Sequence, residues 1–189
     1  MVGIKVTKVA AAVTTFALAV GGLFATEANA ADVITVGYVS PQTGPLAGFG
    51  EADKYVINKM TDYFKKNPLV IKGKKYSVKV ILKDAQSKSS VAASAASDLI
   101  NNDNVNLILA SSTPDITNPV ADQCEANAVP CITTVAPWQA YFLGRQKDPS
   151  KPVPFKWTYH FFWGLEDVIA TYQDIWSQVS TNKIGRAHV

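Results

Sequence analysis

Three hydroxyl side chains follow one another at Ser111, Ser112 and Thr113, between an apolar run and a segment that predicts a helix. Hydroxyl groups donate hydrogen bonds, and the first amide groups of a helix have no partners within it. Such donors can together hold a carboxylate, as helix N-termini often do. An amino acid would fit a site of this kind, although the same hydroxyls could serve only as helix caps.

Two other loops belong to the same predicted edge of the fold. They are Ser40–Gly50, in which Phe49 lies among glycines, and Thr133–Trp138. Each follows a predicted strand, and ligands of parallel α/β sheets bind beyond the carboxyl ends of the strands. Phe49 is therefore a candidate for contact with a ligand; the alternative is that it only packs at the start of the next helix.

The sequence lacks the residue patterns of an exported hydrolase. It has no Gly-x-Ser-x-Gly turn and no His placed after an acidic residue in hydrolase order. Its cysteines and His160 do not have the spacing of a zinc site, and the glycines of 44–50 do not have that of a nucleotide fingerprint. We therefore predict no catalytic residues, no metal and no cofactor, and expect His160 to be a buried or edge residue.

The two cysteines, Cys124 and Cys131, are predicted to lie late in a helix and at the start of the following strand. In an exported protein they could pair with each other. The loop that such a disulfide would close is short, and the chain-entropy model gives it about 2–3 kcal/mol of stabilisation. The alternative is two separately buried thiols.

Strands and helices alternate along the chain, which predicts an α/β fold with a parallel sheet covered on both faces. Strands are expected at 33–39, 76–82, 105–110 and 129–135, and helices at 51–66, from the caps at 87–90 onward, and after a cap at Thr117 or Asn118. Residues 137–154 are too irregular to predict a core element.

An aromatic strand is expected at 157–163, and a final helix from Leu165 to Val179. Trp157, Phe161 and Trp163 are expected to serve in core or hinge packing rather than to contact a ligand.

Residues 1–30 have the three parts of a secretory signal peptide. Lys5 and Lys8 precede a long uncharged stretch, and Ala28-Asn29-Ala30 forms an Ala-x-Ala cleavage site. We predict export with cleavage after Ala30; a retained membrane anchor is the alternative.

The last residues, 183–189, read like one translated frame of a sequencing adapter. We expect them not to belong to the protein, which also removes His188 as a candidate ligand. A genuine basic tail is the alternative. On the adapter interpretation, the gene product is truncated and about half of the functional unit is missing from the sequence.

The formal net charge of +3 is small and its lysines and arginines form no basic stripe. Nucleic acid is therefore not expected as a partner. After the signal peptide, about 150 residues remain, which suffice for one domain with a core.

Four short motifs resemble those of periplasmic solute-binding proteins of the branched-chain amino acid ABC transporter type. They are the Ser-Pro-x-Thr-Gly-Pro-x-Ala-x-aromatic-Gly loop from Ser40, Lys83-Asp84-Ala85, Ser111 to Thr113, and Val129 to Thr133. The resemblance covers Asp32 to Asn182. It implies a type I periplasmic binding fold, in which two α/β lobes are joined by crossing strands and hold a small ligand between them. Residues 31–163 would form the N-terminal lobe and 164–182 the crossover and first helix of a second lobe.

The resemblance also implies ligand contacts at eight positions: Phe49, Ser112, Thr113, Pro114, Val135, Ala136, Pro137 and Trp138. Phe49 falls where the family places an aromatic side chain over the ligand, and residues 112–114 fall where it holds the carboxylate. Residues 135–137 fall where the end of the fourth strand contacts the α-groups. The chain departs from the leucine-binding pattern, because Pro114 replaces a ligand-binding Ser and Pro137 replaces a Thr. These departures put a branched-chain amino acid in doubt.

The function that the resemblance implies is capture of an amino acid or similar small polar solute. A monomer in the periplasm would deliver it, chemically unchanged, to an inner-membrane ABC permease. A ligand-binding sensor domain is the alternative with the same fold, and an exported α/β hydrolase fits the sequence less well.

Overall fold

The computed structural model describes residues 32–179. The predicted signal peptide, its cleavage site and residues 183–189 therefore lie outside the described residues. Among the helices of the described part, none is long and apolar enough to cross a membrane.

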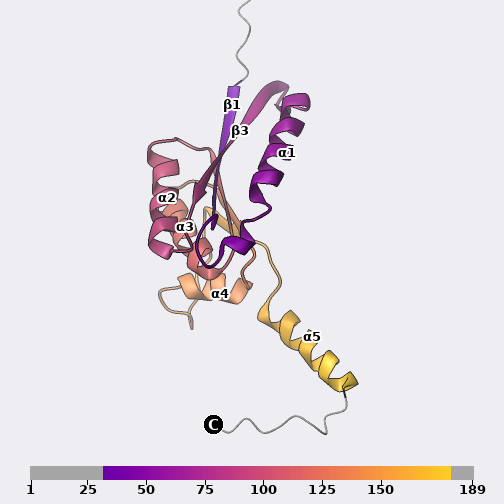
Figure 1. Ribbon diagram of the computed structural model, residues 1–189. Coiled ribbons are helices and arrows are strands. Elements are labelled where there is room, and N and C mark those ends of the chain that lie inside the picture. Colours follow the sequence, from indigo (N-terminus) through magenta and orange to yellow (C-terminus); the bar gives the residue numbers. More distant parts are fainter. Residues whose placement is uncertain (1–31, 180–189) are drawn as a thin grey trace, which may run out of the picture. The chain divides into compact units, whose positions relative to one another are not determined.

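A six-stranded sheet with the strand order β2-β3-β1-β4-β5-β6 forms the centre of the fold (Figure 1). The strands are β1 (Asp32–Ser40), β2 (Leu69–Ile71), β3 (Lys74–Asp84), β4 (Leu107–Ser111), β5 (Cys131–Thr134) and β6 (Thr158–His160). All neighbouring pairs are parallel except β2 and β3, which are antiparallel. The predicted α/β class with a parallel sheet is confirmed, while the short edge strand β2 was not expected.

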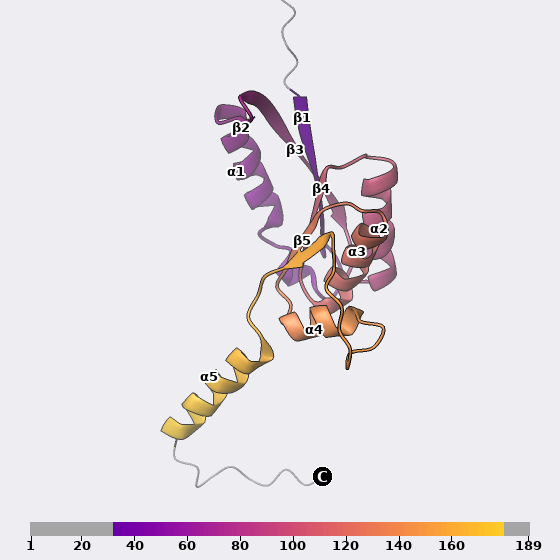
Figure 2. The same cartoon turned by 180° about the vertical axis from the view of Figure 1, so that it is seen from behind.

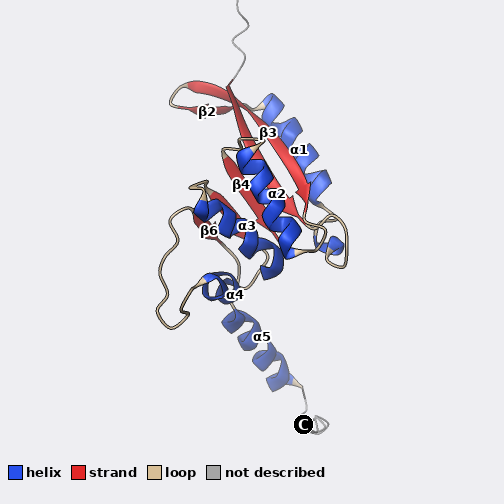
Figure 3. Cartoon of the chain, turned by 90° about the vertical axis from the view of Figure 1, so that its left-hand side faces the viewer, coloured by secondary structure: helices blue, strands red, loops and turns tan. Residues whose placement is uncertain are grey.

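Helices cover both faces of this sheet. The helices of the described residues are α1 (Asp53–Lys66), α2 (Ser89–Asn101), α3 (Pro114–Ala126), α4 (Trp138–Phe142) and α5 (Leu165–Gln178), with short 3-10 helices η1 (Ala47–Phe49) and η2 (Leu143–Arg145). Of these, α1, α2 and α3 pack on the sheet. Figure 1 shows α1 on one side of the strands and α2 with α3 on the other. Figure 3 shows α2 and α3 next to each other in front of the sheet.

The densely packed core lies between the sheet and the α2–α3 pair. Val39, Leu99, Ile108, Ile116 and Val120 are all completely buried there. Ala92 and Ala96 are also fully buried, so small side chains on α2 let its backbone approach the sheet closely, as the sequence predicts. This layer fixes the ends of β1 and β4, from which two of the candidate site loops emerge.

The opposite face is packed less completely. A groove of about 430 Å³ lies between α1 and the strands, with Val56, Met60 and Phe64 on the helix side and Val36 and Leu107 on the sheet side. No residue of α1 is buried, although its apolar stripe is the one that the sequence predicts.

The structure corrects the start of the third predicted helix and the description of residues 137–154. The third helix begins at Pro114 rather than after Thr117 or Asn118, so that Pro119 lies inside it. Proline at the first helical position costs nothing, because its missing amide hydrogen would have had no intrahelical partner. Residues 137–154 are not uniformly irregular, since they contain α4 with the buried Tyr141.

The aromatic strand is shorter than predicted and covers only β6. Phe161 and Trp163 lie beyond it, with 66% and 46% of their surface exposed. These two residues therefore do not pack in a core within the described part of the chain, and their expected role in hinge packing stays a prediction. Figure 2 shows the chain passing from the sheet, through this segment, into α5.

Helix α5 contributes no buried residue. Its first turn is tied to α4, where the Leu165 amide donates to Gln139 Oε1 at 2.9 Å and Trp138 Nε1 donates to Glu166 Oε1 at 2.8 Å. Leu165, Ile169, Tyr172 and Trp176 are all about half exposed. The expectation that this helix belongs to a second lobe stays a prediction.

Candidate functional site

Three loops emerge at one edge of the sheet, where β1, β4 and β5 end. Ser111 pairs with Thr134 in the register of β4 and β5, and Val39 of β1 pairs with Ala110 of β4. Because the strands are parallel and in register, the residues that follow them are brought together. The Thr113 amide donates to the Val135 carbonyl at 3.0 Å, which joins the second and third loops directly.

The hydroxyls of Ser112 and Thr113 are the most informative atoms of this edge. Both oxygens are buried, and neither has a hydrogen-bond partner among the residues that the structure describes. Burying a hydroxyl without a partner costs about 1–3 kcal/mol, so such groups usually have a role. Thr113 occupies the N-cap position of α3 but its side chain makes no capping bond. The alternative in which these hydroxyls serve only as caps is therefore not what the structure shows.

The backbone at the two joined loops is strained. Thr113 has φ of 63° and Val135 has φ of 62°. Both side chains are β-branched, and such residues rarely adopt positive φ. Strain of this type costs about 1–3 kcal/mol per residue and is concentrated at functional sites. These two loops are therefore held in one arrangement by their surroundings.

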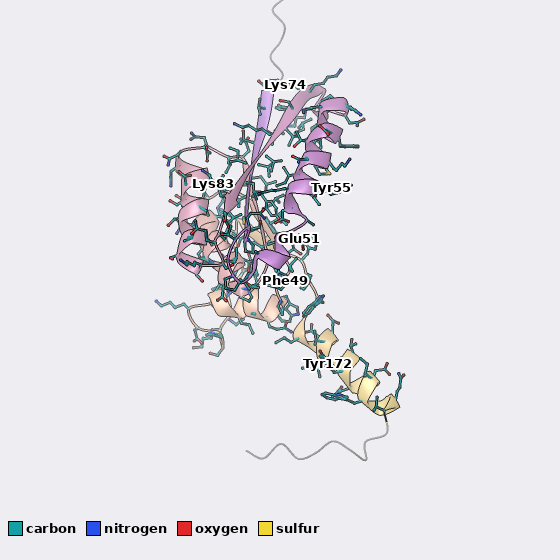
Figure 4. The ribbon with its side chains drawn as sticks, in the orientation of Figure 1. Phe49, Glu51, Tyr55, Lys74, Lys83 and Tyr172 are labelled. Carbon is teal, nitrogen blue, oxygen red and sulfur yellow. The ribbon has the colours of Figure 1, made fainter. Side chains whose placement is uncertain are left out.

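The first loop presents Phe49 to solvent. Phe49 is 55% exposed, so more than half of its surface is available to a ligand, while packing at the start of α1 stays the alternative. Figure 4 shows Phe49 near Glu51, just before that helix begins. The turn that places it requires Gly50, because a Cβ there would lie 2.2 Å from the Pro41 carbonyl oxygen.

Asp84, at the end of β3, anchors this first loop. Its carboxylate accepts hydrogen bonds from the Thr43 hydroxyl at 2.6 Å and from the amides of Gln42 and Gln86 at 2.9 and 2.7 Å. Burial alone would raise the pKa of Asp84, but these hydrogen bonds outweigh it and lower the pKa below its usual value. The Lys83-Asp84-Ala85 motif was noted in the sequence, but its anchoring role was not predicted.

A second carboxylate, Asp53, joins the first loop to β1. It accepts hydrogen bonds from Tyr38 Oη at 2.9 Å, Ser40 Oγ at 2.5 Å and Gln42 Nε2 at 3.0 Å. Tyr38 Oη also lies 2.8 Å from Ser111 Oγ. Burial of the Tyr38 side chain raises the pKa of Tyr38 to about 12. Sequence analysis missed this cluster, because its members lie up to 73 positions apart and no local pattern connects them.

The third loop, Val135–Trp138, is fixed from β6. His160 Nδ1 lies 2.8 Å from Thr133 Oγ1, and His160 Nε2 lies 2.8 Å from the Ala136 carbonyl oxygen. Trp138, 39% exposed, is held by its hydrogen bond to Glu166. The sequence predicted His160 as a buried or edge residue, and it gave no sign of the bond to Ala136.

The two cysteines lie away from this edge of the sheet. Cys124 on α3 and Cys131 on β5 are fully buried and carry free thiols in this structure. Hydrogen bonding to the Cys124 thiol, together with burial, raises the pKa of Cys131 far above its usual value. The two thiols are therefore neighbours, and their pairing stays a prediction. No group of three or more His, Cys, Asp or Glu side chains within 32–179 is arranged to hold a metal ion.

All eight sequence-predicted site residues follow the carboxyl ends of β1, β4 and β5. The structure brings Thr113 and Val135 into direct contact, and it exposes Phe49 and Trp138 on the two flanking loops. Ala136 is buried, so only its backbone is available at this edge. Pro114 and Pro137 lack amide hydrogens and supply no backbone donor. Whether these residues contact a ligand stays a prediction.

Comparison with known proteins agrees with this arrangement. A family model described as periplasmic binding protein matches residues 33–184. The chain therefore belongs to the periplasmic binding protein family. No curated protein matches the chain in sequence.

Solved structures with the same fold include two amino-acid-binding proteins. One is the branched-chain amino acid transporter substrate binding protein LivJ from Streptococcus pneumoniae in complex with isoleucine, with 20% identity and a TM-score of 0.57. The other is the leucine binding protein LivK from Thermotoga maritima, with 19% identity and a TM-score of 0.58. The matches cover 70% and 75% of this chain but only 34% and 37% of those proteins.

A third similar structure holds a different ligand. It is a solute binding protein of an ABC transporter from Rhodopseudomonas palustris in complex with 3,4-dihydroxybenzoic acid, with 27% identity and a TM-score of 0.52 over 71% of this chain and 33% of that one. The described residues thus form one lobe of the family's fold, and the chain spans about a third of the length of these relatives.

Proposed function

We propose that this chain is part of a solute-binding component of an ABC importer, and that its carboxyl edge is the first half of the ligand site. The observation that carries the proposal is the pair of buried hydroxyls at Ser112 and Thr113, next to the N-terminus of α3, which have no hydrogen-bond partner among residues 32–179. Two donors and a helix N-terminus suit a carboxylate.

The Ser112 and Thr113 hydroxyls also indicate the class of ligand, because such donors suit a carboxylate. Isoleucine and 3,4-dihydroxybenzoic acid, the ligands of two of the similar structures, differ in their side groups but share a carboxylate. We infer that this chain binds a small solute through such a carboxylate, with Phe49 and Trp138 as apolar walls. The substitution of Pro114 and Pro137 for hydroxyl residues of the leucine pattern removes polar contacts, so the remainder of the ligand need not be a branched-chain amino acid.

The second half of the site would come from a second lobe, whose crossover and first helix we place at 164–182. Closure of two lobes on one ligand stabilises the closed state only through contacts that the open state lacks. The protein would act as a monomer in the periplasm, after cleavage following Ala30, and would pass the solute unchanged to a membrane permease.

Binding is tested by calorimetry on the full-length protein that carries this chain, against a panel of amino acids and aromatic carboxylates. We expect one panel member to bind, and Thr113→Ala to weaken its binding by about 1–3 kcal/mol because a buried acceptor loses its donor. Ser112→Ala should act in the same direction.

The matched control is Ser94→Ala, which removes an exposed hydroxyl on α2 and should leave affinity unchanged. Equal affinity of the Ser112 and Thr113 variants and the unmodified protein would remove the hydroxyls from the site. Chemical turnover of any panel member would contradict a binding protein altogether.

A further inference from the structure

His160 makes a bridge that the sequence did not suggest. It ends β6, and its two ring nitrogens lie 2.8 Å from Thr133 Oγ1 and 2.8 Å from the Ala136 carbonyl oxygen. A carbonyl oxygen only accepts, so Nε2 must carry the hydrogen of the neutral ring. Nδ1 then accepts from the Thr133 hydroxyl. Burial lowers the pKa of His160 below its usual value, which keeps this neutral form in place.

The imidazole ring is itself firmly held. It stacks on the Tyr141 ring with centroids 4.3 Å apart and an interplanar angle of 16°. The Arg145 guanidinium lies 4.8 Å from the centroid of that same Tyr141 ring. The Arg145 side chain is only 1% exposed, and it donates to Asp122 Oδ1 at 2.7 Å and to Thr158 Oγ1 at 3.0 Å. His160 therefore has little freedom to change its orientation.

The loop that His160 holds is the strained one. Ala136 lies between Val135, with its positive φ, and Pro137, and it is 1% exposed. Such a conformation persists only when neighbouring groups determine it. Two bonds do so here, since the Thr113 amide donates to the Val135 carbonyl and His160 Nε2 donates to the next carbonyl along the chain.

We propose that His160 is a positioning residue for solute capture, which holds the Val135–Trp138 loop against Thr113 without touching the solute. The inference rests on the proposed function, because the loop position alters affinity only if a solute binds at this edge. It also gives β6, the last strand before α5, a direct bond to the candidate site.

Two substitutions separate positioning from packing. His160→Phe keeps an aromatic ring to stack on Tyr141 but loses both hydrogen bonds. His160→Gln loses the ring but keeps an amide donor near the position of Nε2. If His160 serves only to fill space, the Phe variant should bind better than the Gln variant; if it positions the loop, the order is reversed.

The affinity measurement uses the full-length protein, with L-isoleucine and 3,4-dihydroxybenzoate as probes. For a probe that binds the unmodified protein, we expect His160→Phe to weaken binding about tenfold, the effect of losing one or two neutral hydrogen bonds. We expect His160→Gln to stay within about threefold of the unmodified protein. Tyr159→Phe is the control, because it changes the exposed neighbour on the same strand and should have no effect.

Equal affinity of the Phe variant and the unmodified protein, or weaker binding by the Gln variant than by the Phe variant, would overturn the positioning role. If the unmodified protein binds neither probe nor any other small carboxylate, the proposed function fails instead. In that case the backbone amide NMR signals of Val135, Ala136 and Trp138 in the ligand-free protein decide the structural claim. Larger changes in the Phe variant than in the Gln variant support the positioning role, and equal, smaller or absent changes in the Phe variant overturn it.

Discussion

Two carboxylates, Asp53 at the start of α1 and Asp84 at the end of β3, fix the position of the first candidate site loop. Asp53 gathers three donors from β1 and its loop, and Asp84 gathers the Thr43 hydroxyl and nearby amides. Neither residue is among the predicted ligand contacts. They position the loop without contacting a ligand, because they give its polar groups fixed hydrogen-bond partners. Apart from η1, this loop has no regular secondary structure.

The anchoring by Asp84 has a defined pH dependence. Its pKa in the folded protein is lowered, so the native state binds fewer protons than the unfolded state near the usual carboxyl pKa of about 3.9. The stability that this carboxylate contributes is therefore fully present above about pH 4 and is lost as the pH falls further.

We expect Asp84→Asn to lower the free energy of unfolding by about 1–2 kcal/mol at pH 7, because charged acceptors make stronger hydrogen bonds than neutral ones. The difference from the unmodified protein should shrink below about pH 4, as urea denaturation at several pH values would show. Asp62→Asn, which changes an exposed carboxylate paired only with Lys65 on α1, is the control. A difference that is the same at acidic and neutral pH would contradict this explanation.

At the level of elements, α3 and β5 are joined in two places. At the carboxyl edge the Thr113 amide bonds to the Val135 carbonyl, and at the other end Cys124 and Cys131 are buried against each other. The loop between the two cysteines includes the turn at Asn127 and Ala128, where Ala128 has φ of 56°. A covalent link there would hold the helix to the strand that carries half of the candidate site.

We expect the exported protein to contain a Cys124–Cys131 disulfide. Mass spectrometry after denaturation and alkylation without reductant should then detect no modified cysteine, and two after reduction. Reduction should lower stability by about 2–3 kcal/mol, the value of the chain-entropy model for a loop of this length. Two alkylated cysteines before reduction would instead establish a pair of buried thiols.

At the level of the whole molecule, the described lobe has one well-packed face and one open face. The groove under α1 is lined by apolar side chains, and α5 exposes an apolar stripe that includes Tyr172 and Trp176. Contiguous exposed apolar patches usually mark contacts with other parts of a polypeptide or with another protein. They agree with the finding that the chain spans about a third of its structural relatives.

We expect the isolated polypeptide 31–182 to self-associate through the α5 stripe. Light scattering should show a mass above that of a monomer, and the double variant Tyr172→Ser, Trp176→Ser should reduce it because the apolar area available for association falls. Thr171→Ser, a polar exchange on the same helix, is the control. A monomeric unmodified polypeptide would show that the exposed stripe is not adhesive.

Much of this fold was predictable from sequence because its strands and helices have clear local patterns. Runs such as 33–39 and 105–110 are apolar and β-branched, and each became a strand of the parallel sheet. The stretch 111–113 was also recognisable, because its hydroxyls stand just before a helix. These signals depend on neighbouring residues in the chain, and such patterns survive in a single sequence.

Tertiary structure alone decided how buried those residues are and which partners they have. It showed that the Ser112 and Thr113 hydroxyls are buried without a hydrogen-bond partner within the part of the chain that the structure describes, whereas Ser111 Oγ lies 2.8 Å from Tyr38 Oη. It also showed that Phe161 and Trp163 are exposed and that His160 bonds to Ala136, 24 positions away. Hydrogen-bond partners and burial depend on which distant segments the sheet order brings together, and no local pattern encodes that order.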